Sequence, residues 1–70
     1  MMPINLAPVG EESIILKVSG SPETKQHLQD MGFVPGGKAT VISSNGGNII
    51  VNVKNVRVAV TREMAQKIFV

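Results

Sequence analysis

Three polar side chains in the first half of the chain have the types and spacing of a metal site. Glu23, His27 and Asp30 stand at positions i, i+4 and i+7, so on a helix they project from one face. Two carboxylates and an imidazole suit ferrous iron or zinc, although a site would also need a further ligand and supporting hydrogen bonds. The alternative is an ordinary solvated helix face, because Asp and Glu are mostly surface residues. Both interpretations stay open on the residues alone.

No other group of residues indicates catalysis. His27 is the single histidine, and cysteine is absent, which removes thiolate chemistry and disulfides. Gly46-Gly47 lacks the spacing and the Lys-Ser/Thr ending of a phosphate-binding loop. General acid–base catalysis needs groups that converge in a pocket, and the five acidic residues are scattered. We therefore expect no enzyme and no cofactor, apart from the metal considered above.

Size and hydropathy indicate one small domain covering residues 1–70. A core of this size seldom supplies more than ~3–5 kcal/mol of net stability. No segment approaches the ~20 apolar residues that a bilayer-spanning helix needs. The N-terminal residues also lack the basic and apolar regions of a signal peptide. We expect a cytoplasmic protein without direct membrane insertion.

The charge pattern argues against nucleic acid as a partner. The formal charge is +2, and the seven basic residues are spread along the chain without a run. Readers of single strands stack bases on aromatic side chains, and this chain has only Phe33 and Phe69. No nucleic-acid partner is expected, and a small-barrel nucleic-acid binder is kept as a third alternative.

The first half of the chain predicts a strand followed by a short helix. In residues 11–19, Ile14, Leu16 and Val18 alternate with other residues, which predicts a half-buried strand. Ser21 is a good N-cap for the helix that follows, with a proline directly after it. The apolar side of this helix, which we expect to face the core, carries Thr24, Leu28 and Met31.

The second half predicts three strands and a closing helix. We expect strands over residues 38–44, 49–54 and 56–60, with a hairpin at Asn45-Gly46-Gly47-Asn48 and a tight turn at Lys54-Asn55. Thr61 would cap a final helix with an apolar stripe of Met64 with Ile68 and Ala65 with Phe69. Short strands with tight hairpins predict a mainly β fold: a small SH3-like β-barrel with one inserted short helix and a C-terminal helix.

The run Leu28-Gln29-Asp30-Met31-Gly32-Phe33-Val34-Pro35-Gly36 joins the first helix to the next strand. Gly32 can adopt the left-handed conformation that ends a helix, and Pro35 biases the residue before it toward extended geometry. The run positions four apolar side chains, Leu28, Met31, Phe33 and Val34. They either pack as core beneath the turn or contribute to an exposed patch that binds a partner.

Three segments together resemble the FeoA family of ferrous iron transport proteins. Pro8-Val9-Gly10-Glu11 is similar to its opening turn, and Leu28-x-x-Met31-Gly32-Phe33-Val34-Pro35-Gly36 resembles its helix-to-strand signature. Val58-Ala59-Val60-Thr61-Arg62-Glu63-x-Ala65-x-x-Ile68 resembles its closing strand and helix. The resemblance covers nearly the whole chain in order. Met31 stands where the signature more often has Leu, and Asn55 stands where Gly is usual.

The resemblance implies an SH3-like barrel that works in bacterial ferrous iron uptake. It implies a non-enzymatic accessory protein that docks on the cytoplasmic G-protein part of the membrane transporter FeoB. We expect Leu28, Met31, Phe33 and Val34 to form or line the partner-facing patch. The face of Glu23, His27 and Asp30 is not part of the family signature. An open edge of such a barrel could also support a weak homo-oligomer.

Overall fold

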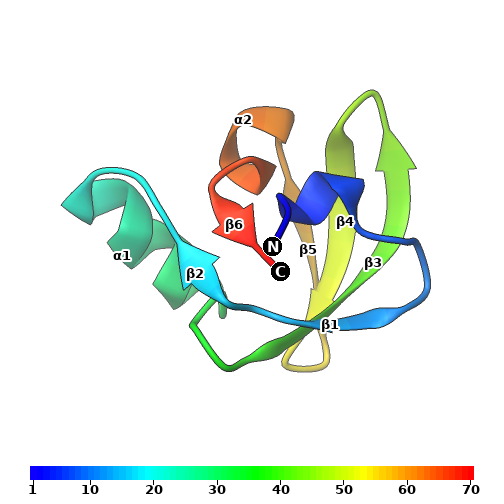
Figure 1. Cartoon of the computed structure of the whole chain (residues 1–70), viewed down its shortest axis with the longest axis horizontal. Helices are drawn as coiled ribbons and strands as arrows, with labels where there is room; N and C mark the ends of the chain where they lie inside the picture. The colour runs from blue at the N-terminus through cyan, green and yellow to red at the C-terminus, as the bar shows by residue number, and fades with distance from the viewer.

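The computed structural model describes residues 1–70, which form two antiparallel sheets around one core (Figure 1). The larger sheet has the strand order β1-β3-β4-β5, and the smaller one pairs β2 with β6. The strands are β1 Glu12–Ile14, β2 Lys17–Val18, β3 Lys38–Asn45, β4 Asn48–Val53, β5 Val56–Val60 and β6 Ile68–Phe69. The helices are the 3-10 turn η1 Ile4–Leu6, α1 Pro22–Asp30 and α2 Arg62–Ala65.

The larger sheet is built by hairpins with the predicted turn chemistry. Gly46 and Gly47 join β3 to β4, and Lys54 and Asn55 join β4 to β5. All four residues have positive φ, which gives the right-handed twist that two-residue hairpins need. Ile42 is an extra residue where the β3–β4 register shifts between Val41 and Ser43, an irregularity that the sequence pattern did not predict.

The predicted single strand over residues 11–19 is wrong, because the chain changes sheet in its middle. The backbone N–H of Ile15 donates to the Gly37 carbonyl at 2.8 Å, whereas that of Leu16 donates to the Phe69 carbonyl at 2.8 Å. The change of partner breaks the alternation of side chains. Ile15 is therefore completely buried, while Ile14 and Leu16 are 47% and 55% exposed.

The predicted closing helix is shorter than its apolar stripe suggested. Thr61 caps α2 as expected, its hydroxyl accepting from the Met64 N–H at 3.4 Å, but the helix ends at Ala65. Ile68 and Phe69 instead pair with Val18 and Lys17 as strand β6. Pairing with β2 gives the backbone N–H and C=O groups of these two residues hydrogen-bond partners. In a longer helix the same groups would have bonded within the helix. The mainly β, SH3-like fold class is confirmed, since β1 and β2 together link the two sheets into one small barrel.

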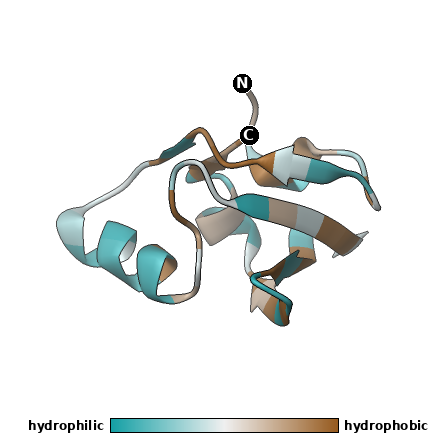
Figure 2. Cartoon of the chain, turned by 90° about the horizontal axis from the view of Figure 1, so that it is seen from below, coloured by the Kyte–Doolittle hydropathy of each residue, from teal (hydrophilic) through white to brown (hydrophobic).

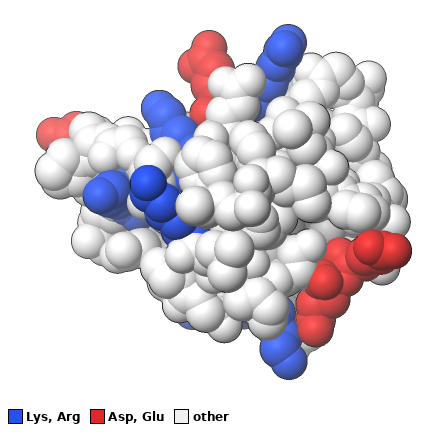
Figure 3. Space-filling view, viewed as in Figure 1, with Lys and Arg blue, Asp and Glu red and all other residues white.

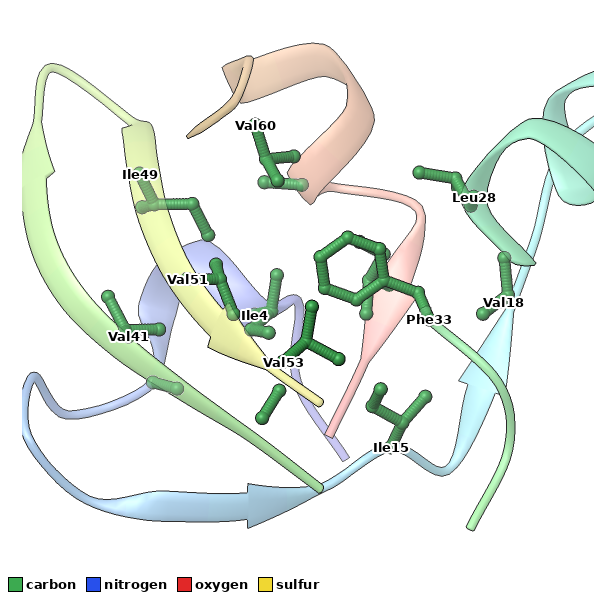
Figure 4. Packing of buried hydrophobic residues seen from close by; sticks show 14 residues of the cluster. Ile4, Ile15, Val18, Leu28, Phe33, Val41, Ile49, Val51, Val53 and Val60 are labelled. Carbon is green, nitrogen blue, oxygen red and sulfur yellow. The ribbon is translucent and has the colours of Figure 1, made fainter. Parts of the chain in front are cut away.

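Aliphatic side chains from almost every element, with one aromatic ring, fill the core (Figure 4). Fourteen buried apolar residues form one cluster, and no polar or charged side chain is buried in it. The fully buried larger side chains are those of Phe33, Ile4, Ile15, Leu28, Ile68, Val51 and Val53. Burial of this apolar surface is the main favourable term in folding so small a domain.

Candidate functional site

The candidate site is the elbow, defined here as residues 31–37 between α1 and β3. Ser21 accepts a hydrogen bond from the Thr24 N–H at 3.2 Å and so caps the start of α1. At the other end, the Gly32 N–H donates to Gln29 at 2.9 Å and the Phe33 N–H donates to Leu28 at 2.9 Å. These two bonds, with Gly32 at φ 106°, are the Schellman arrangement that ends helices.

The Schellman turn places Phe33 against Leu28 and sends both into the core. Both side chains have no exposed surface. Figure 4 shows the Phe33 ring pointing inward from the elbow, with Leu28, Val18 and Ile15 around it. A hydrophobic contact across this motif is common because its geometry brings these two positions together. Phe33 and Leu28 therefore hold α1 on the barrel.

The rest of the elbow is tied to the barrel by its backbone. The Gly36 N–H donates to the Ile15 carbonyl at 2.7 Å, and the Ile15 N–H donates back to Gly37 at 2.8 Å. A side chain on Gly32 would approach Val53 to 3.3 Å, so the turn sits directly against the sheet. The elbow is thus fixed at both ends, which presents its exposed side chains in a defined geometry.

Of the four predicted site residues, only Met31 and Val34 have surface that a partner could touch. Both are partly buried, and Met31 also packs against the core cluster. Leu28 and Phe33 cannot contact a partner in this conformation, which corrects the expectation that all four line the patch. Pro35, exposed next to Val34, extends the accessible apolar surface, and it was not among the residues expected from the sequence. Figure 2 shows the contrast between the hydrophilic α1 and the hydrophobic segment after it.

The exposed apolar residues of the elbow line no cavity. One surface hollow lies over the β3–β4 hairpin end of the larger sheet, and the other lies beside Lys38 and Lys54 and includes Gly36 of the elbow. Neither is lined by Met31 or Val34. Small-molecule sites are usually concave, so the elbow is better suited to a protein surface.

Glu23, His27 and Asp30 do not form a metal centre in the structure. All three side chains are exposed on α1, and Asp30 accepts a hydrogen bond from Gln26 at 2.9 Å. No group of three or more His, Asp or Glu side chains is arranged to hold a metal ion. The exposed positions fit the solvated-face interpretation, and the metal-site alternative stays a prediction, because helical spacing alone has not brought the three groups together.

Neither helix is long and apolar enough to cross a membrane. The two antiparallel sheets, closed by short strands and helices around one core, define the class of the protein by its architecture as a small SH3-like barrel. The comparisons with known proteins make the assignment specific. The FeoA domain family model matches residues 2–70, so the chain belongs to the FeoA domain family.

Two relatives illustrate the match. A protein of Methanocaldococcus jannaschii described as "Putative Fe(2+) transport protein A" is 36% identical over all 70 residues, which cover 85% of that protein. The crystal structure of an iron uptake regulatory protein, FeoA, has a TM-score of 0.89 at 28% identity. That match covers 96% of this chain and 91% of the other.

A second structure supports the fold alone. FeoA of Stenotrophomonas maltophilia, complexed with zinc and described as a prokaryotic SH3 domain protein, has a TM-score of 0.84 at 19% identity. The alignment covers 99% of this chain and 88% of that protein. The agreement extends to the whole barrel, including the inserted helix region.

Proposed function

We propose that this protein is a non-enzymatic accessory protein of ferrous iron uptake that acts in the cytoplasm on a FeoB-type membrane transporter. The observation that carries the proposal is the family match over residues 2–70, together with a relative that is 36% identical along the whole chain and is described as an Fe(2+) transport protein A.

The docking surface is the exposed part of the elbow, with Met31 and Val34 at its centre. Apolar surface on a rigid turn loses little conformational entropy when it binds, which favours affinity. A methionine at the edge of the patch can adapt its shape to the partner. The partner in this proposal is the cytoplasmic G-protein part of the transporter.

The test is the affinity of this chain for the purified cytoplasmic domain of FeoB, measured by calorimetry. Met31→Asp places a charge in the middle of the patch, and we expect it to weaken binding about tenfold or more, as loss of a central anchor does. Leu6→Asp is the matched control, because Leu6 is 65% exposed on η1, which lies away from α1 and the elbow (Figure 1). Binding by Leu6→Asp should equal that of the wild type.

The folded state of each variant is checked by thermal unfolding, because Met31 also packs on the core. Val34→Asp provides a second variant at the same surface. Equal affinity of the wild type and both folded elbow variants would place the docking surface elsewhere. Absence of any binding by the wild type would reject the direct contact with FeoB.

The nucleic-acid alternative receives no support from the structure. Phe33 is buried, so Phe69, partly buried on β6, is the single aromatic side chain with any exposed surface. Much of the face in Figure 3 is uncharged, and the basic side chains on it do not form a continuous surface. Stacking groups and a basic channel are what single-strand binding requires.

A further inference from the structure

The outer edge of β5 is an unpaired strand edge, and Arg57 is the one charged residue in the strand. β5 is the last strand of the larger sheet, and none of its backbone groups takes part in the hydrogen bonds outside the ladders. Its sequence, Val-Arg-Val-Ala-Val, has strong β propensity and contains no proline. Val56 is 59% exposed, and Val58 is only partly buried. Natural proteins normally block such an edge.

The opposite edge of the same sheet, β1, is better protected than β5. β1 has only three residues, and it begins at Glu12, whose carboxylate lies 3.9 Å from the Lys38 ammonium. Shortness and charge are common means of preventing edge pairing. The two edges of one sheet therefore differ in their capacity to add a strand.

The hairpin geometry determines which backbone groups of β5 are free. The two-residue turn at Lys54-Asn55, with positive φ at both residues, is closed by the pair Val53 and Val56. In a hairpin of this type the closing pair is hydrogen-bonded. Hydrogen-bonded pairs recur at every second residue of an antiparallel ladder. Val56, Val58 and Val60 therefore direct their backbone groups toward β4. The N–H and C=O groups of Arg57 and Ala59 point away from the sheet.

We propose that two copies of this chain associate through an antiparallel β5–β5 pairing centred on Val58, independently of the function proposed above. In this register Arg57 of one copy lies opposite Ala59 of the other, and Val56 lies opposite Val60. The pairing satisfies the free backbone groups of Arg57 and Ala59 in both copies. It also covers the exposed valines of the strand.

The charge pattern of the strand selects this register over its neighbours. A register centred on Arg57 would place two guanidinium groups directly opposite each other, which is destabilising. A register centred on Ala59 would pair Arg57 with Thr61, which has left the strand to cap α2. The register centred on Val58 is the one that pairs all five residues of β5 without opposing like charges. The two-fold pairing uses the β5 edge of each copy. No free β5 edge remains for a third copy, so the assembly closes at a dimer.

The test is the dimer dissociation constant, measured by sedimentation equilibrium of the whole chain. Ala59→Glu places a carboxylate opposite Arg57 of the second copy and should strengthen the dimer. Ala59→Arg places two guanidinium groups there and should weaken it. Each substitution acts twice in the symmetric dimer, so each shift should be about two- to thirtyfold. The double variant Arg57→Glu/Ala59→Arg restores opposite charges and should recover the wild-type affinity or exceed it.

The matched controls are Ser43→Glu and Ser43→Arg. Ser43 is exposed on β3, two strands away from the β5 edge, so these variants change net charge without meeting Arg57 of a second copy. They should leave the dimer constant near that of the wild type.

Hydrogen exchange gives a second readout, because the amides of Arg57 and Ala59 should become protected as concentration rises. A wild type that stays monomeric at NMR concentrations would overturn the proposal. Equal dimer constants for Ala59→Glu and Ala59→Arg, or unprotected Arg57 and Ala59 amides in a dimer, would do the same.

Discussion

At the scale of single residues, Phe33 connects the family signature to the physics of the fold. Its backbone N–H closes the Schellman turn, and its ring fills the centre of the core. One residue thus fixes the direction of the chain after α1 and attaches that helix to the barrel. The surface left to a partner consists of its neighbours Met31 and Val34.

Replacement of Phe33 by Leu should lower the free energy of unfolding by about 1–3 kcal/mol, because the smaller side chain leaves part of the core unfilled. The same change at Phe69, which is only partly buried, should cost less. Urea unfolding of both variants measures the difference. Equal losses at the two positions would show that Phe33 is not the central core residue.

The sequence left open whether the apolar residues of the elbow were core or surface, and the reason is physical. Leu28 and Phe33 are at the two positions that a Schellman motif brings together, whereas Met31 and Val34 are not. The glycine signal for the turn was visible, but the inward direction of Phe33 depends on where the helix docks. Docking is tertiary, so local spacing could not supply it.

At the scale of elements, the chain reuses one segment to join two sheets. The region around Ile15 pairs with the elbow, and the next residue pairs with β6. Alternation placed Ile14 and Leu16 on the buried face with Val18, whereas the change of partner buries Ile15 and leaves Ile14 and Leu16 exposed. The hairpins were predicted correctly, because Gly46, Gly47 and Asn55 supply positive φ through local chemistry alone.

The broken strand makes a direct prediction for two adjacent isoleucines. Ile15→Val should lower the free energy of unfolding by about 0.5–1.5 kcal/mol, since a buried methylene is lost. Ile14→Val should change it by less than about 0.5 kcal/mol, because Ile14 is largely exposed. The two substitutions are chemically identical, so chemical denaturation compares the sites alone. A larger loss at Ile14 would contradict the change of sheet.

At the scale of the whole molecule, the barrel separates two surfaces. The elbow projects between α1 and β3, and the free edge of β5 lies at the end of the larger sheet. We propose contact with the transporter for the elbow and self-association for the β5 edge. The fold class was accessible from the sequence because four short predicted strands with strong turn signals leave few alternatives. Which surface binds a partner was not accessible, because exposed apolar residues occur on several faces.

The most direct test of the central claim, a role in ferrous iron uptake, is the uptake of radiolabelled ferrous iron by cells. The cells should express the FeoB of the same organism and lack any FeoA of their own. We predict that uptake rises when this chain is supplied, that Leu6→Asp supports the same rise, and that folded Met31→Asp does not. Uptake that is the same with and without the wild-type chain would contradict the account.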